Sequence, residues 1–146
     1  IVELEKRGGP PVIAAVGNNG PSGEPLYPGA YPQVLGVTAV DREQKIFRYA
    51  NRGDHVDFAA LGVNVKVADS GGGYRIESGT SMASPRIAAL VAEARRNDAV
   101  STADIVAAMI SNATDLGQAG FDPVFGHGLI TRLPAVVSQL RSSPQD

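Results

Sequence analysis

The sequence predicts an α/β fold with a mostly parallel sheet and a β-hairpin that leads into a helix. Residues 12–16 (VIAAV) and 34–40 (VLGVTAV) are continuous apolar runs, which is typical of strands covered on both faces of a parallel sheet. After Ser81, apolar residues follow the i, i+3, i+4, i+7 spacing of one helical face. They are Ile87, Leu90, Val91 and Ala94. Buried strands combined with an amphipathic helix indicate layers of helix packed on sheet.

The composition fits a single domain. The chain has 146 residues, of which 43% are hydrophobic and 19% charged, and its formal charge is −2 without a basic block, so no nucleic-acid partner is expected. No apolar run is long enough to cross a bilayer. The absence of cysteine excludes a disulfide scaffold, a thiol nucleophile and a cysteine zinc site. The chain starts at Ile1 without an initiator Met or a signal peptide, so we expect it to be a piece of a longer product.

The first sixty residues predict the end of a helix and three strands. Residues 1–7 suit a helix end, which Gly8 to Pro11 terminate because Gly favours the position after a helix and Pro cannot continue it. Residues 17–25 (GNNGPSGEP) form a dense turn signal. We expect a third, shorter strand over residues 55–60 and a polar surface loop over residues 41–54.

The remaining residues predict a hairpin and further helices. Residues 63–68 and 74–78 flank DSGGG, which is the pattern of a hairpin with a glycine loop. Ser101 opens another helix, and Asp104 three residues later forms a variant of the capping box. The expected buried face of this helix consists of Ile105, Val106, Met109 and Ile110. A last short helix is expected over residues 133–140.

The link between the first two strands contains turn signals and no helical pattern, although parallel neighbours normally need a helical crossover. We therefore expect that the chain does not build a complete doubly wound fold from its own strands. Its sheet would end at an unpaired edge beside residues 12–16, with apolar surface uncovered. Such an edge predicts dimerisation, exchange of elements, aggregation or co-purification with a partner.

The stretch ESGTSMASP (residues 77–85) leaves two interpretations open. Ser81 or Ser84 could be a polar N-cap, because Ser and Thr are favoured at that position. Ser81 could instead be a nucleophile, since a helix start offers a free backbone N–H and a dipole that favours negative charge. A serine nucleophile also needs a base, a group that orients the base, and donors for the oxyanion. Asn18 follows a buried strand and could be such a donor, although a turn-forming Asn is the simpler interpretation.

Five motifs follow one another along the chain: VIAAVGNNG, YPGAYPQVLGVTAV, VDFAALGVNV, SGTSMASPRIAALVA and FGHGLI. In this order and spacing they resemble the C-terminal half of the catalytic domain of a subtilisin-like serine protease. The resemblance covers nearly the whole chain. It implies a three-layer α/β fold, with residues 1–140 as part of the catalytic domain and residues 141–146 as a frayed tail. It also implies hydrolysis of polypeptide substrates by a secreted or periplasmic enzyme.

The resemblance carries roles to individual residues. Ser81 matches the nucleophile and Asn18 the oxyanion-hole side chain, with assistance from the Ser81 N–H and from Thr80. Substrate-binding positions are implied for Ala15, Val16, Gly17, Leu26 and Gly79. Of these, Leu26 would lie near the floor of the pocket for the residue before the scissile bond, where it favours an apolar substrate side chain.

Two further implications concern a loop and an ion. The Tyr27–Pro28 bond matches one that is cis in members of this family. Asp57 matches a position where some members bind a weak monovalent cation or calcium, although a loop hydrogen-bond acceptor is the simpler role. The chemistry requires no cofactor, and structural calcium is an expectation for the longer protein only.

The catalytic order in this family is Asp, then His, then Ser, yet no Asp or His precedes Asn18. His55 matches a surface position, and His127 lies in the FGHGLI turn. Without a base, Ser81 is not activated. We therefore expect the chain to be inactive alone and to need an N-terminal part that supplies Asp and His.

Three other functions compete with a subtilisin-like protease. An α/β-hydrolase esterase would use Asp122 and His127 after Ser81, but Ala83 breaks the G-x-S-x-G elbow and two predicted helices fill much of the intervening stretch. The stretch SGGGYRIESGTS resembles a phosphate-binding loop less well, because the Lys that such a loop requires before its Ser or Thr is missing. A pseudoprotease or binding module on the same scaffold is the non-enzymatic alternative.

Overall fold

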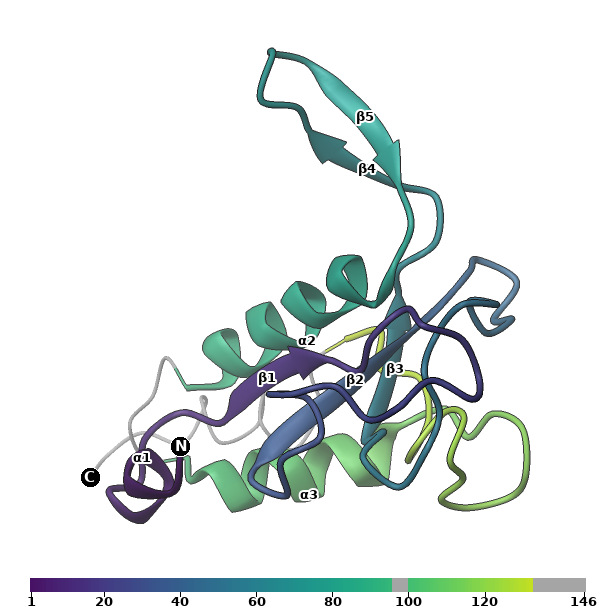
Figure 1. Cartoon of the computed structure of the whole chain (residues 1–146). Coiled ribbons are helices and arrows are strands. Elements are labelled where there is room, and N and C mark those ends of the chain that lie inside the picture. Colours follow the sequence, from purple (N-terminus) through teal and green to yellow (C-terminus); the bar gives the residue numbers. More distant parts are fainter. Residues whose placement is uncertain (96–99, 133–146) are drawn as a thin grey trace.

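The computed structural model describes residues 1–95 and 100–132 of the chain. The elements are α1 (Val2–Lys6), β1 (Val12–Ala15), β2 (Val34–Val40), β3 (Phe58–Leu61), β4 (Val65–Ala68), β5 (Tyr74–Glu77), α2 (Thr80–Ala94) and α3 (Thr102–Asn112). Figure 1 shows α2 running along the sheet, while the hairpin of β4 and β5 projects from the body of the molecule. The predicted mixed α/β class is confirmed.

The main sheet has three parallel strands in the order β1-β2-β3. Val12 pairs with Val34, so the first two strands are direct neighbours. Residues 16–33 link these strands without a helix, as the turn signals predicted, although parallel neighbours usually have a helical crossover. This loop contains the Tyr27–Pro28 peptide bond, which is cis as the resemblance implied.

The two edges of the sheet differ. Beside β3, Leu129 forms a parallel bridge with Ala59, so the chain near its C-terminal end covers that edge. At the opposite edge, within residues 1–95 and 100–132, β1 pairs with β2 alone. All four residues of β1 are half-buried. The unpaired edge predicted from the sequence is therefore present in the described part of the chain, and dimerisation or exchange of elements through it stays a prediction.

One core joins the sheet to both long helices. Val37 of β2 and Phe58 of β3 are fully buried in it. The buried helical residues are Ala83, Ile87, Val91 and Ala94 from α2, and Ile105, Ala108 and Met109 from α3. Leu90 and Val106, which were expected in the core, are half-buried. Ile110 is 41% exposed, so its expected burial is wrong, because Ala108 occupies the buried stripe of α3 in its place.

The third strand begins later than the sequence predicts. β3 starts at Phe58, and residues 55–57 form its approach loop, where the Asp57 N–H donates to the Gly36 carbonyl at 2.8 Å. The expectation of a surface loop over residues 41–54 is also wrong in part, because Asn51 is fully buried.

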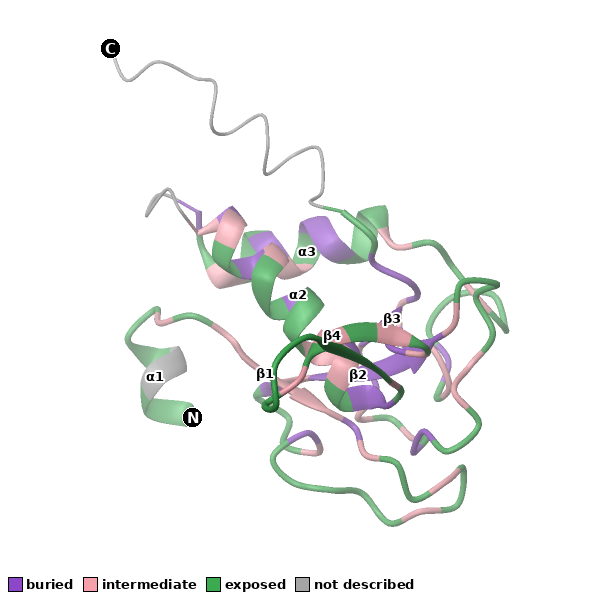
Figure 2. Ribbon diagram, turned by 90° about the horizontal axis from the view of Figure 1, so that it is seen from above, coloured by how far each residue is buried: buried purple, intermediate pink, exposed green. Residues whose placement is uncertain are grey.

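The start of α3 matches the predicted cap. The Ser101 hydroxyl accepts a hydrogen bond from the Asp104 N–H at 3.1 Å and donates to the Asp104 carboxylate at 2.6 Å. The hairpin is largely exposed, and Figure 2 shows β4 carrying exposed and half-buried residues only. The helix expected over residues 133–140 and the tail 141–146 lie outside the described residues.

Candidate active site

Ser81 is the second residue of α2, directly after the turn that joins the hairpin to the helix. The N-cap of α2 is Gly79, which has no side chain to cap with, so neither Ser81 nor Ser84 is the N-cap that the sequence left open. Ser81 is exposed. Its N–H belongs to the first helical turn, where backbone N–H groups have no intrahelical acceptor and the helix dipole favours negative charge.

The loop after β1 reaches the start of α2 through one side chain. The Oδ1 atom of Asn18 accepts hydrogen bonds from the backbone N–H and from the hydroxyl of Thr80, each at 3.0 Å. The Thr80 hydroxyl also accepts from the Gly17 N–H at 3.3 Å. Because both Thr80 donors bind the amide oxygen, the orientation of the Asn18 amide is set. Its NH2 group makes no hydrogen bond to the described residues.

Gly79 separates the Asn18 amide from the Ser81 hydroxyl. A Cβ atom placed on Gly79 would lie 3.3 Å from Asn18 Nδ2 and 3.6 Å from Ser81 Oγ. The two polar groups therefore flank one small space, which exists because position 79 carries no side chain. A carbonyl group in that space could meet a nucleophile and a hydrogen-bond donor together.

Gly17 and Leu26, for which the resemblance implies substrate-binding roles, come together beside Asn18. Gly17 has a φ of 110°, and a Cβ there would lie only 2.6 Å from Leu26 Cδ1, so this contact requires glycine. Leu26 is 38% exposed and Ala15 is half-buried. The Val16 side chain is fully buried, so only its backbone can face a ligand.

Asn51 is a positioning residue that the sequence did not single out. Its Oδ1 accepts from the Asn19 N–H at 2.7 Å, and its Nδ2 donates to the Glu24 carbonyl at 2.8 Å. Its own N–H donates to the Gly17 carbonyl at 3.0 Å. One buried amide thus ties together two stretches of the 16–33 loop, one next to Asn18 and one next to Leu26. An Asn in a polar segment far from that loop gives no local signal of such a role.

The two histidines lie outside this arrangement. The His127 ring packs against Phe58 and Phe121, with ring centroids 5.8 Å and 5.1 Å apart. Asp122 is buried, and its carboxylate accepts from the backbone N–H groups of Gln118, Val124 and Phe125. These bonds give Asp122 a structural role in its own loop, in place of the partnership with His127 that an esterase would need.

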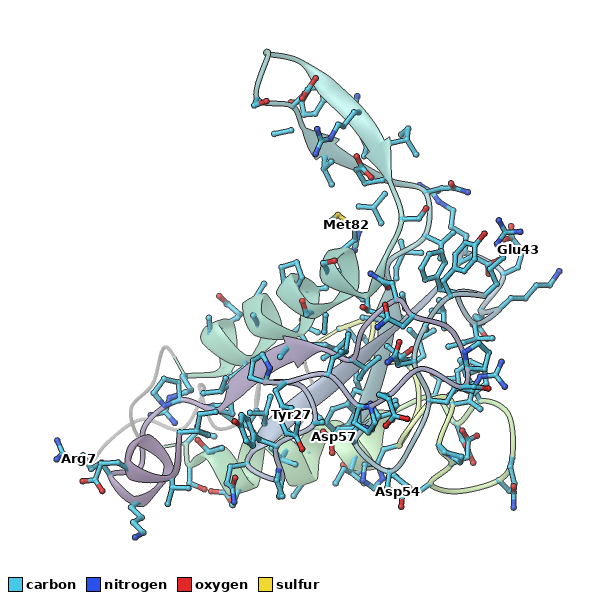
Figure 3. All side chains as sticks on the ribbon, in the orientation of Figure 1. Arg7, Tyr27, Glu43, Asp54, Asp57 and Met82 are labelled. Carbon is cyan, nitrogen blue, oxygen red and sulfur yellow. The ribbon has the colours of Figure 1, made fainter. Side chains whose placement is uncertain are left out.

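Asp57 borders a cavity of about 500 Å³ that Tyr27 and His55 also line; Figure 3 labels Tyr27 and Asp57. Burial raises the pKa of Asp57, and the Gly36 hydrogen bond and the charges of His127 and His55 offset only part of this rise. Calcium takes six to eight oxygen ligands, whereas the described residues hold no group of three or more His, Cys, Asp or Glu able to bind a metal. Asp57 Oδ2 accepts from the Gly36 N–H at 2.6 Å, which is the loop-acceptor role considered from the sequence. A cation site at Asp57 stays a prediction.

The fold is that of an α/β protein with a parallel sheet. Ser81 at the start of α2 lies beside Asn18 from the loop after β1, and this combination defines a hydrolase-like site. The family model described as "Subtilase family" matches residues 3–128. The chain therefore belongs to the subtilase family, and the resemblance inferred from the motifs is confirmed.

Curated relatives agree with this assignment. The chain is 38% identical over 121 residues to "Minor extracellular protease Epr" of Bacillus subtilis (strain 168), covering 82% of this chain and 19% of that protein. It is 43% identical over 81 residues to "Thermophilic serine proteinase" of Bacillus sp. (strain AK1), covering 56% and 20%. It is 32% identical over 134 residues to "Subtilisin E" of Bacillus subtilis (strain 168), covering 89% and 34%. The chain thus spans between about a fifth and a third of the length of these relatives.

No helix in residues 1–95 and 100–132 is both long enough and apolar enough to span a bilayer.

Proposed function

We propose that this chain carries the nucleophile and the oxyanion hole of a serine endopeptidase that cleaves peptide bonds through an acyl-enzyme. The supporting observation is the small space beside Gly79, where a Cβ on Gly79 would lie 3.3 Å from Asn18 Nδ2 and 3.6 Å from Ser81 Oγ. Membership of the subtilase family supports the same chemistry.

In this proposal Ser81 Oγ attacks the carbonyl carbon of the substrate while its proton passes to a base. The oxygen of the tetrahedral intermediate accepts hydrogen bonds from Asn18 Nδ2 and from the Ser81 N–H, at the positive end of the α2 dipole. The carbon–nitrogen bond then breaks, and the amine leaves with the proton. Water hydrolyses the remaining ester and restores the Ser81 hydroxyl.

Thr80 has a positioning role in this scheme. Its hydroxyl proton is engaged by Asn18 Oδ1, and the residue is fully buried. Thr80 therefore acts on the oxyanion through the orientation of Asn18. To donate directly to the oxyanion, the Thr80 hydroxyl would have to give up its hydrogen bond to Asn18 Oδ1.

The base is the element that this chain does not supply to Ser81. His127 and Asp122 are engaged elsewhere, and no Asp or His precedes Asn18 in the sequence. We propose that polypeptide outside this chain provides both the His and the Asp, and we call the combination the assembled enzyme. For subtilisin itself, loss of the catalytic His lowers kcat about 10⁶-fold, so the isolated chain is expected to be inactive.

The relatives support a localisation and a substrate class for the assembled enzyme. The relative named "Minor extracellular protease Epr" is extracellular by name, and we propose secretion and polypeptide substrates for the assembled enzyme. The apolar Leu26 beside Gly17 favours an apolar side chain before the scissile bond.

Labelling with a fluorophosphonate, read by intact mass, tests the proposal. We expect one label on Ser81 in the assembled enzyme, none after Ser81→Ala, and none on the isolated chain. Stoichiometric labelling of a preparation proven to hold only this chain would overturn the need for an outside base. An assembled protein that neither reacts nor cleaves peptides would favour the binding-module alternative.

A further inference from the structure

The loop that follows β1 (Figure 1) contains the only Asn-Gly dipeptide of the sequence, Asn19–Gly20, directly after Asn18. The Asn19 side chain is exposed and makes no hydrogen bond to the described residues. Gly20 has no side chain, and a Cβ placed on it would meet no atom within 4 Å. Steric hindrance therefore does not keep the Gly20 nitrogen from the side-chain carbon of Asn19.

An Asn followed by Gly can lose its amide without an enzyme, and Asn is among the thermolabile residues. The Gly20 nitrogen attacks Asn19 Cγ, the new nitrogen–carbon bond closes a succinimide ring, and the Cγ–Nδ2 bond breaks. Ammonia leaves with the proton that the Gly20 nitrogen gives up. Water then opens the ring at either carbonyl, which yields aspartate or isoaspartate at this position.

Two hydrogen bonds oppose this attack in the folded chain. The Gly20 N–H donates to the Tyr49 carbonyl at 2.7 Å, and the Asn19 N–H donates to Asn51 Oδ1 at 2.7 Å. The first bond favours the protonated amide, because the Tyr49 oxygen would face the amide anion that attacks. Together the bonds hold the peptide units on both sides of Asn19, and the second unit has to rotate before its nitrogen reaches Cγ.

We propose that Asn19 is a deamidation site, that the Tyr49 carbonyl and the Asn51 side chain protect it in the folded enzyme, and that isoaspartate at this position inactivates the enzyme. Asn51 is fully buried, so water does not compete for its bond to the Asn19 N–H. The site reacts when the loop leaves its native position and both hydrogen bonds are broken.

Isoaspartate damages the site because it lengthens the main chain. It continues the chain through its side-chain carbon and so inserts one methylene group, about 1.5 Å of chain, directly after Asn18. The Asn18 amide is held by Thr80 at its oxygen, so a displaced main chain pulls it away from these bonds. A misplacement of about 1 Å can lower a rate about 10²-fold. This loss of activity rests on the proposed function, whereas the modification itself does not.

Ageing of the assembled enzyme with Ser81→Ala, which prevents self-cleavage, measures the modification alone. Samples are held at mildly alkaline pH, either folded or in guanidinium chloride, and deamidation is followed by peptide mass spectrometry. We expect Asn19 to react before every other Asn in the denaturant. In the folded protein it should react about five- to a hundredfold more slowly, the range that two hydrogen bonds supply. Equal rates in the two states would overturn the protection.

Asn51→Ala in the same background tests the role of the buried side chain. It removes the acceptor of the Asn19 N–H, so Asn19 should deamidate about two- to tenfold faster, the range of one hydrogen bond. Asn64, an exposed Asn in the bend before β4, is the internal reference and should keep its rate. An unchanged rate at Asn19, or an equal acceleration at Asn64, would overturn a local role of Asn51.

Anion exchange of aged, active enzyme then separates the molecules that have gained a negative charge. Molecules with isoaspartate should have a kcat/KM about 10²-fold lower. Asn19→Asp carries the same charge without the extra methylene group and should stay within about fivefold of the wild type, the size of an exposed charge effect. Isoaspartate molecules as active as this variant would overturn the inactivation and leave the proposed function intact. An enzyme that is inactive before ageing would overturn the proposed function, and the deamidation rates of the Ser81→Ala protein would still decide the modification.

Discussion

Asn18 and Thr80 are joined by two hydrogen bonds to one atom: the Thr80 N–H and hydroxyl both donate to Asn18 Oδ1 at 3.0 Å. The pair is separated by 62 residues in the sequence. The bonds tie the loop after β1 to the start of α2, and they give the helix a cap that its own N-cap, Gly79, does not provide. The Asn18 side chain thus stabilises the start of α2 with its Oδ1 atom, and its Nδ2 atom is available as a hydrogen-bond donor in the candidate site.

Replacing Asn18 separates these two roles. Asn18→Asp keeps an acceptor for Thr80 and removes the NH2 donor, so kcat of the assembled enzyme should fall while thermal stability is kept. The expected loss is about 10²–10³-fold, which is the range established for the oxyanion asparagine of subtilisin and is borrowed from it. Steady-state kinetics with a peptide substrate and a thermal melt measure the two effects.

Asn18→Ala is the matched comparison, because it removes both the donor and the acceptor. It should lose about 1 kcal/mol of stability through the missing helix cap, in addition to the kinetic loss. If Asn18→Asp retained full kcat, the oxyanion role of Asn18 would be refuted.

Thr80→Val tests the positioning role of the hydroxyl. Val has a similar shape but leaves the Gly17 N–H without its acceptor, so the free energy of unfolding should fall by about 1–3 kcal/mol. Because the Asn18 amide loses one of two anchors, kcat should fall with little change in KM. Thr80→Ser restores the hydroxyl and should rescue kcat; a Val variant with unchanged kcat would contradict the role.

Gly79→Ala fills the space between the Asn18 NH2 group and the Ser81 hydroxyl. The new methyl group would lie where the substrate carbonyl must enter, so kcat/KM should fall about 10²-fold, as misplacement of reacting groups by about 1 Å does. Gly120→Ala is the control, since Gly120 also has a positive φ, of 84°, but open space around it. The control should lose some stability and no activity, and equal kinetic losses in both variants would argue against the assigned space.

Asp57 makes stability depend on pH in a known direction. Burial raises the pKa of Asp57 in the folded state, so the folded protein binds this proton more tightly than the unfolded chain does. The stabilisation is present below the unfolded pKa and is lost as pH rises through the folded pKa. Asp57→Asn keeps an acceptor for the Gly36 N–H and cannot ionise.

The variant should therefore gain stability relative to the wild type as pH rises from the unfolded pKa of Asp57 through its folded pKa. Urea unfolding at a series of pH values from acid to neutral measures this difference. Parallel stability curves for the two proteins would show that burial does not perturb Asp57.

The sequence by itself determined the family and the parallel class of the sheet, and it singled out Ser81 and Asn18 as candidate site residues. Continuous apolar runs, helical periodicity and the GTSMASP stretch are local signals, and they remain readable without any knowledge of packing. The predicted strand over 34–40 and the Ser101 cap agree with the structure for this reason.

Tertiary structure alone decided which groups meet. The Thr80 bonds orient the Asn18 amide, and the Asn51 bonds join its own segment to the 16–33 loop. Both sets of bonds connect segments that are distant in the sequence. The late start of β3 and the exposure of Ile110 also depend on neighbouring segments. Hydrogen bonds and burial between distant residues depend on how the chain packs, and no local pattern records that packing.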